Sequence, residues 1–130
     1  MNPPNAHIGL RHVALYIQNL EACEKFYVDV LGFKCDWKPD EDNIYLSTGY
    51  DNLALHRAKP DFNPAKDQRL DHIGIILKEQ SDVDDWFEFI KANDGDIRKT
   101  PKDHRDGTRS FYCADPDGNI VQLIWIPTIK

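Results

Sequence analysis

Three histidines and one glutamine occupy related places in a chain that repeats itself. The segment Leu10–Leu15 aligns with Leu70–Ile75, which pairs His12 with His72. The segment Asp51–His56 aligns with Asp117–Gln122, which pairs His56 with Gln122. If the two copies pack around a pseudo-two-fold axis, the four side chains can converge on one divalent metal ion. We therefore predict His12, His56, His72 and Gln122 as metal ligands, with a buried polar network as the alternative.

These ligand types define the chemistry of such a site. Imidazoles and an amide oxygen suit zinc, nickel, iron or cobalt better than calcium or magnesium. None of them adds negative charge, so the ion would keep its full charge and attract an anionic, oxygen-rich substrate. It would act as a Lewis acid that stabilises a developing enolate, alkoxide or catecholate, or that lowers the pKa of bound water.

Proton abstraction would require a base, and Gln122 cannot serve as one. His56 could do so if it is not a ligand, because histidine titrates near neutral pH. Arg109 could aim its guanidinium at a substrate anion, although a solvated surface arginine is the alternative. His104, on a charged loop over residues 101–107, is another candidate base, although we expect its side chain to be solvated.

The elements that must position these residues follow from hydrophobic periodicity. Apolar runs rich in β-branched residues predict strands over 13–17 and 73–77, and a helix follows each run. Asn19 is expected to cap the first helix and Gly32 to end it, while Ser81 with Asp84 resembles a capping box. Three short strands follow in each copy, most clearly at 44–48, 53–57, 109–114 and 119–126, and Trp37 is expected in a loop. The pattern is βαβββ twice, an α+β fold.

Alternation along the strands predicts which way the histidines point. Side chains on a strand alternate between its two faces. Val13, Leu15 and Ile17 share one face, the natural partner for the helix, and His12 lies on the other. His72 alternates in the same way with the apolar residues of its own strand. Both imidazoles are therefore expected to point away from the helices.

Composition bounds the remaining possibilities. The chain has 130 residues, a net charge of −6 and 41% hydrophobic residues, typical of one globular domain. We expect a first module over about 10–57, a linker over 58–69 and a second module over about 70–126.

The negative net charge argues against nucleic-acid binding, and no apolar run is long enough to span a membrane. Three cysteines without a CxxC spacing, and no signal peptide, favour reduced thiols in the cytoplasm.

Four segments carry a family resemblance that covers residues 10–126. They are Leu10–Leu15, Phe26–Phe33, Leu70–Gly74 and Ser110–Asn119. The chain resembles the vicinal oxygen chelate superfamily, which includes glyoxalase I, extradiol dioxygenases and bleomycin resistance proteins. The resemblance implies two βαβββ modules that form a curved mixed-sheet cup around a divalent metal, with helices outside. It also implies ligands at His12, His56, His72 and Gln122, and a homodimer.

The sequence departs from that family at the last-strand positions. Glyoxalase I-like members carry glutamates there, one of which moves a proton, and extradiol dioxygenases use a carboxylate ligand. Here those positions hold His56 and Gln122. We expect a metal-dependent lyase, isomerase or dioxygenase that acts on a small molecule with no organic cofactor. The alternative is a metal-free ligand-binding protein like the bleomycin resistance proteins.

Overall fold

The computed structural model describes residues 1–4, 6–64 and 67–129. The chain divides into two compact units, Met1–Pro60 and Asp61–Lys130. The boundary between them falls inside the segment 58–69 that was predicted as a linker, of which residues 65 and 66 lie outside the described residues. The organisation into a single domain stays a prediction, and each unit is described by itself.

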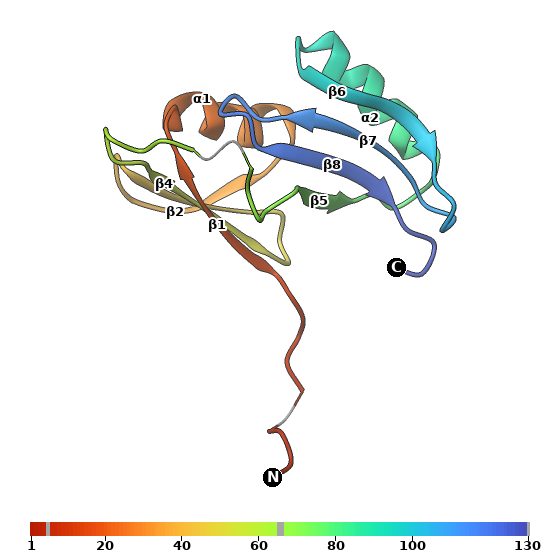
Figure 1. Cartoon of the computed structure of the whole chain (residues 1–130), viewed down its shortest axis with the longest axis horizontal. Helices are drawn as coiled ribbons and strands as arrows, with labels where there is room; N and C mark the ends of the chain where they lie inside the picture. Colours follow the sequence, from red (N-terminus) through yellow and green to blue (C-terminus); the bar gives the residue numbers. More distant parts are fainter. Residues whose placement is uncertain (5, 65–66, 130) are drawn as a thin grey trace. The chain divides into compact units, whose positions relative to one another are not determined.

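The first unit is a four-stranded mixed sheet with one helical segment (Figure 1). Its elements are β1 (His12–Ile17), α1 (Leu20–Lys25), a π-helical turn (Phe26–Val30), β2 (Lys34–Asp40), β3 (Asn43–Ser47) and β4 (Asn52–Arg57). The spatial order is β1-β4-β3-β2, with β1 parallel to β4 and the other neighbours antiparallel. The parallel pair requires a crossover, which the helical segment begins.

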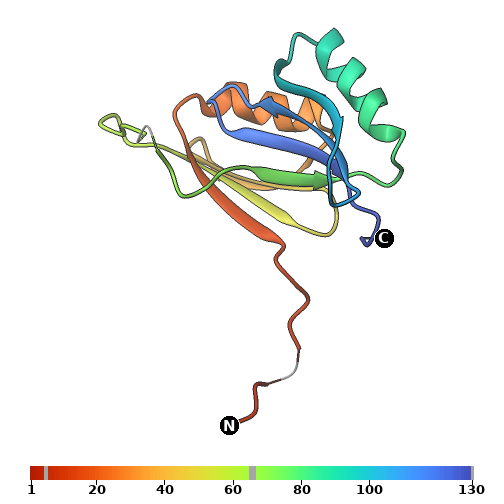
Figure 2. The same ribbon diagram turned by 45° about the vertical axis from the view of Figure 1, so that its right-hand side comes forward.

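The second unit repeats this topology. Its elements are β5 (Ile73–Ile76), α2 (Asp82–Ala92), β6 (Asp96–Asp103), β7 (Arg109–Ala114) and β8 (Ile120–Trp125). The order β5-β8-β7-β6 again has a parallel first pair and antiparallel neighbours elsewhere. Figure 2 shows α2 lying beside the sheet of its own unit, where it contacts β6, β7 and β8. The predicted α+β fold of two βαβββ modules is confirmed.

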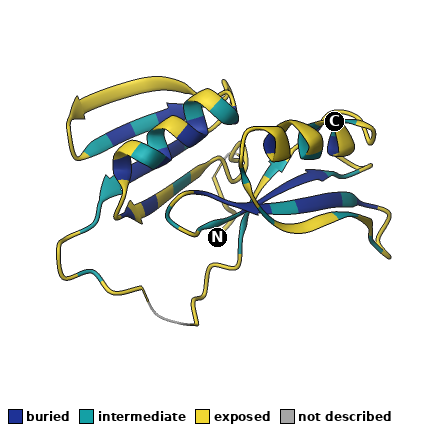
Figure 3. Cartoon of the chain, turned by 90° about the horizontal axis from the view of Figure 1, so that it is seen from above, coloured by how far each residue is buried: buried dark blue, intermediate teal, exposed yellow. Residues whose placement is uncertain are grey.

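Each sheet has a core face under its helix and a second face, which we call the far face, turned away from it. Figure 3 shows buried, intermediate and exposed residues along the strands and helices. In β1 the buried residues are Leu15 and Ile17, whereas His12 and Tyr16 are exposed. In the second unit Phe111, Cys113, Val121 and Leu123 are buried together with the α2 residues Val83 and Ile90. Since apolar burial is the main favourable term in folding, this pattern fixes which side of each strand meets the helix. The predicted orientation of His12 away from the helix is confirmed.

The two edge strands β2 and β6 are the elements that the sequence places least well. All seven residues of β2 are exposed, and β6 alternates only weakly. Both strands pair with their neighbours through irregular registers. The structure corrects two predictions here, because Trp37 lies in β2 rather than in a loop and Pro101 lies in β6. An edge strand tolerates this proline since one side of its backbone needs no partner.

The helix starts differ between the two units. Asn19 caps α1 as predicted, with its Oδ1 accepting from the Ala22 backbone N–H at 3.2 Å. Ser81 makes no capping hydrogen bond with its side chain, so the predicted capping box does not form. Instead, Asp82 Oδ2 accepts from the Glu79 backbone N–H at 2.9 Å, and Asp84 binds Arg109.

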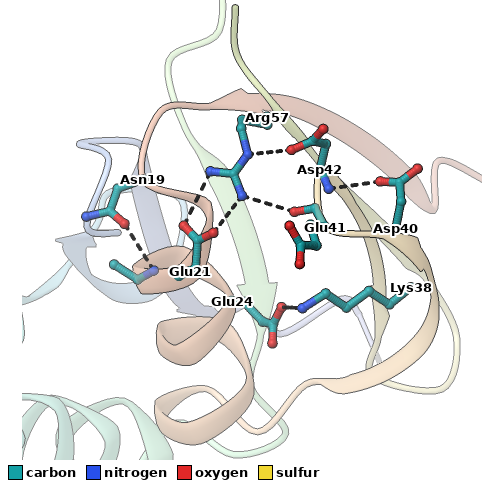
Figure 4. Close-up of polar contacts among 9 residues, drawn as sticks. Asn19, Glu21, Glu24, Lys38, Asp40, Glu41, Asp42 and Arg57 are labelled. Atoms are coloured by element: carbon teal, nitrogen blue, oxygen red, sulfur yellow. Dashed lines mark hydrogen bonds and ion pairs between the residues drawn. The ribbon is translucent and has the colours of Figure 1, made fainter. Parts of the chain in front are cut away.

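One arginine of the first unit forms ion pairs with both the helix α1 and the β2–β3 turn. The Arg57 guanidinium, at the end of β4, donates to Glu21 of α1 and to Asp42 of the β2–β3 turn, both at 2.6 Å (Figure 4). It also donates to the Glu41 carbonyl oxygen at 3.0 Å. The hydrogen bond from Arg57 lowers the pKa of Glu21. Because these carboxylates are largely exposed, the network contributes little stability and mainly fixes the turn.

A buried aspartate organises the turn between β7 and β8. Asp115 is 2% exposed, and its carboxylate accepts from the backbone N–H groups of Asp117 and Asn119 and from Asn119 Nδ2, each at 2.9 Å. This turn sets the start of β8 and therefore the position of Gln122.

We expect Asp115→Ala to lower the free energy of unfolding by about 2–4 kcal/mol, because it removes charge-assisted hydrogen bonds and leaves buried donors unpaired. Chemical denaturation would measure the change, with the exposed Asp61→Ala as the control. A loss below about 0.5 kcal/mol would contradict this role for Asp115.

Candidate functional site

Strand pairing corrects the sequence alignment of the last strands. In the first sheet His12 pairs with Asn52, Ala14 with Ala54 and Tyr16 with His56. In the second sheet Gly74, the counterpart of Ala14, pairs with Gln122. The structural counterpart of Gln122 is therefore Ala54, and the counterpart of His56 is Ile124.

This register separates the two histidines of the first unit. His56 lies four residues beyond the strand position next to His12, which is about 13 Å at roughly 3.3 Å per residue. Both side chains lie on the far face, but they do not lie beside each other. At this distance His56 and His12 of one chain do not bind the same metal ion.

The histidine rings are held in one defined orientation. His12 Nδ1 lies 3.1 Å from the Asn52 carbonyl oxygen and 2.9 Å from Asn52 Oδ1. His72 Nδ1 lies 2.6 Å from Asp71 Oδ2, and His56 Nδ1 lies 2.7 Å from Asn43 Oδ1. A carbonyl or carboxylate oxygen can only accept, so Nδ1–H is the donor. In the neutral ring this leaves the lone pair on Nε2, the arrangement in which metal-binding histidines are usually held.

The amide of Gln122 is equally constrained. Gln122 is 7% exposed, and its Nε2 donates to Ser110 Oγ at 3.0 Å and to Tyr112 Oη at 2.9 Å. These bonds use both amide hydrogens. Its Oε1 accepts no hydrogen bond from any residue in the described part of the chain. The amide therefore presents a free oxygen, the atom by which glutamine binds a cation.

Tyr112 connects the polar residues of the second far face. Its ring contacts His72 edge-on, with 5.4 Å between ring centroids. The Lys99 ammonium lies over the same ring, 5.5 Å from its centroid. Sequence reasoning missed Tyr112 and Ser110, although β7 was predicted, because only the register shows that Tyr112 pairs with Gln122.

An aromatic row crosses the far face of the first sheet. Trp37 stacks on Tyr45 with 5.2 Å between ring centroids, Tyr45 meets His56 edge-on at 5.8 Å, and His56 contacts Tyr16 at 6.5 Å. Trp37 is 59% exposed and Tyr16 is 67% exposed. The row gives His56 a packing role and forms a surface on which a planar ligand can stack.

Arg109 does not belong to the candidate site. Its guanidinium donates to Asp84 of α2 at 2.8 and 3.0 Å and to Asp103 at 3.0 Å. The hydrogen bond from Arg109 holds the pKa of Asp84 below its ordinary value. Since α2 covers the core face, Arg109 lies on the opposite side of the sheet from Gln122. That Arg109 could aim its guanidinium at a substrate anion stays a prediction, and its bonds to Asp84 and Asp103 favour a structural role instead.

The cysteines do not add a nucleophile to either far face. All three are free, with Cys23 and Cys113 buried and Cys35 exposed. Burial raises the pKa of the Cys113 thiol to about 12, so this thiol stays protonated at neutral pH.

The described residues contain no group of three or more His, Cys, Asp or Glu side chains arranged to hold a metal ion. Each unit presents its donors separately, with His12 on the first far face and His72 with Gln122 on the second. None of the described helices is long and apolar enough to cross a bilayer.

Comparisons with known proteins agree with this architecture. Residues 9–123 match the model of the Glyoxalase/Bleomycin resistance protein/Dioxygenase superfamily. Metallothiol transferase FosB of Staphylococcus epidermidis is 27% identical over 116 residues, covering 88% of this chain and 80% of that protein. The FosB protein of Staphylococcus haemolyticus is 28% identical over the same length, covering 88% and 81%.

A solved structure shows the same fold. The lactoylglutathione lyase from Agrobacterium tumefaciens superposes with a TM-score of 0.74 at 24% identity, covering 95% of this chain and 96% of that one. With two βαβββ modules and polar donors on the far faces, the architecture is that of the vicinal oxygen chelate proteins. This chain belongs to the Glyoxalase/Bleomycin resistance protein/Dioxygenase superfamily.

Proposed function

We propose that this protein is an enzyme that binds a divalent metal ion, zinc, nickel, iron or cobalt, and uses it on a small oxygen-chelating metabolite. The proposed ligands are His72 and Gln122 of the second unit, and His12, whose ring is held in the same way in the first unit, stays a predicted ligand. The observation that carries the proposal is the orientation of these side chains, with Nε2 of both histidines and Oε1 of Gln122 left free by their hydrogen bonds.

The donor set fits a borderline metal. Imidazole nitrogens and one amide oxygen suit the proposed metals, and the hydrogen bonds from Nδ1 to Asn52 and Asp71 are of the kind that orient such ligands. A bound ion would supply Lewis-acid stabilisation of negative charge on a substrate oxygen. Tyr112 and Lys99 lie beside Gln122 and His72 and can orient an anionic substrate.

Group transfer, which was not among the lyase, isomerase and dioxygenase reactions expected from the sequence, fits this site better than the proton transfer of an isomerase. Position 122 carries an amide, which cannot act as a base. An isomerase that abstracts a proton next to a carbonyl needs such a base. Addition of a thiol to an electrophilic carbon does not require one on the protein, because thiols ionise partly in solution. The printed name of the FosB relatives, metallothiol transferase, points to the same class of reaction.

The reaction we propose is therefore thiol addition to a small anionic oxygen electrophile. The thiolate sulfur forms a bond to carbon, the carbon–oxygen bond breaks, and the oxygen takes a proton from water. The test is loss of free thiol when cysteine or glutathione is mixed with a panel of small anionic epoxides and the zinc- or nickel-loaded protein. A rate that depends on the metal and falls in His72→Ala supports the proposal. Rates equal to the metal–buffer blank across the panel contradict it.

A second function has one observation in its favour. The aromatic row of Trp37, Tyr45, His56 and Tyr16, whose two end residues Trp37 and Tyr16 are exposed, is suited to binding a planar ligand without any metal. In that case quenching of tryptophan fluorescence by aromatic ligands would be unchanged by a chelator and lost in Trp37→Ala. Quenching that requires metal would rule out this alternative.

We also propose that the protein works as a homodimer in the cytoplasm. Light scattering at micromolar concentration would report the mass, for which a single chain of 15.0 kDa sets the monomer value. A monomeric mass at all concentrations would contradict the dimer.

A further inference from the structure

A histidine outside the proposed ligand set is connected to Gln122 through one hydroxyl group. His104 lies in the turn between β6 and β7, and its Nε2 is 2.8 Å from Ser110 Oγ. Ser110 is 1% exposed, and the same oxygen lies 3.0 Å from Gln122 Nε2. These two hydrogen bonds connect His104 in the β6–β7 turn to Gln122 on the far face of the second sheet.

The turn holds His104 in place. Its backbone N–H donates to the Thr108 carbonyl oxygen at 2.8 Å, and the Gly107 N–H donates to the His104 carbonyl oxygen at 3.0 Å. Asp106 Oδ1 accepts from both the backbone N–H and the hydroxyl of Thr108. Gly107 has φ of +88°, a conformation that favours glycine. This closed turn fixes the direction in which the imidazole reaches Ser110.

The direction of each hydrogen bond follows from the donor inventory. An amide nitrogen can only donate, so Ser110 Oγ accepts from Gln122. The single hydroxyl hydrogen of Ser110 can then be donated to His104 Nε2, and this arrangement gives both the hydroxyl and the imidazole a partner. In this arrangement the donors run from Gln122 through Ser110 to His104, and His104 carries its proton on Nδ1.

The opposite arrangement would change the site. If His104 carried its proton on Nε2, it would donate to Ser110, and the Ser110 hydroxyl hydrogen would be free to turn to Gln122. The amide could then accept at this position, with Oε1 bound to the hydroxyls and its N–H groups directed away. Those hydrogens would repel a cation, whereas the observed arrangement leaves Oε1 free.

We infer that His104 is a positioning residue that acts through Ser110 to hold Gln122 with its Oε1 free for a ligand on the far face of the second sheet. The inference deepens the proposed function, on which it rests only for the identity of that ligand as a metal ion. It reverses the expectation that His104 is merely a solvated loop residue.

The first test reads the tautomer and does not depend on metal. Nitrogen NMR of the full-length, metal-free protein at pH 8 should show His104 with an unprotonated Nε2. The Gln122 side-chain amide hydrogens should exchange slowly in the wild type and faster in His104→Phe. A proton on His104 Nε2, or Gln122 exchange that His104→Phe leaves unchanged, would overturn the inference.

The second test uses zinc affinity and a matched pair of variants. His104→Phe removes the acceptor and should weaken zinc binding by about 10- to 100-fold, the range for residues that orient metal ligands. His104→Gln keeps an acceptor oxygen at a similar reach and should stay within about threefold of the wild type. Equal losses in both variants, with both folded by thermal unfolding, would overturn the inference. If the wild type binds no zinc, the proposed function fails, and the NMR result alone decides the role of His104.

Discussion

Replacing His72 with alanine is expected to lower zinc affinity by roughly 100-fold or more. Loss of a residue that only orients a ligand already costs up to about 100-fold, so loss of the ligand itself should cost at least as much. His72 is well prepared for this role, because Asp71 Oδ2 accepts from its Nδ1 at 2.6 Å and leaves Nε2 free. Titration of metal-free protein with zinc against a competing chelator would measure the change.

A matched control for this variant is present in the same chain. In His7 the Nδ1 atom accepts from the Gly9 backbone N–H at 3.1 Å, the reverse of the arrangement in His72. His7→Ala should therefore leave zinc affinity unchanged within about twofold. Similar losses in both variants would mean that zinc binds non-specifically to histidines, which would contradict the proposed site.

Truncation of Phe111 is expected to be the most destabilising single change among those considered. Its ring is fully buried on the core face of β7 and meets Phe87 of α2 edge-on, with 5.5 Å between ring centroids. Deleting a buried phenylalanine side chain typically costs about 3–5 kcal/mol, from lost burial and from the cavity left behind. Phe111→Ala should therefore lower the free energy of unfolding by about that amount, as measured by urea denaturation.

The neighbouring residue provides the control for Phe111. Tyr112 lies on the far face, so Tyr112→Phe removes only the hydroxyl that accepts from Gln122. We expect a change of about 0.5–1.5 kcal/mol, the net worth of one hydrogen bond. If the two variants were equally destabilised, the assignment of these consecutive residues to opposite faces would be contradicted.

The repeat and its strand alternation made much of the fold predictable from sequence. Apolar residues at every second position identify β1 and β5 and place Val13, Leu15 and Ile17 toward the helix. The same rule places His12 on the far face, where the structure has it. Exposed edge strands lack this signal, which explains why β2 and β6 were not placed and why Trp37 was expected in a loop.

The alignment error at His56 has a clear physical cause. The sequence alignment paired His56 with Gln122, whereas strand pairing makes Ala54 the counterpart of Gln122. A slip of two residues leaves every side chain on the same face, so alternation cannot detect it. Only the pairing of β1 with β4, which depends on the turns and the crossover, shows the difference.

The supporting contacts of the candidate site were also beyond sequence reasoning. Asn52 and Asn43, which orient His12 and His56, lie 40 and 13 residues from them in sequence. The same limitation applies to His104, whose connection to Gln122 depends on a turn conformation and on Ser110. Asp71 is the exception, because it directly precedes His72 and could have been noted.

The central claim is that this chain is a metal protein whose ligands include His72 and Gln122. The most direct test is elemental mass spectrometry of protein purified without an affinity metal and then equilibrated with zinc or nickel. We predict close to one equivalent of metal per chain in the wild type and in Arg109→Gln, and strongly reduced content in His72→Ala and Gln122→Leu. Metal below about 0.1 equivalent in the wild type, or full content in both ligand variants, would contradict the claim.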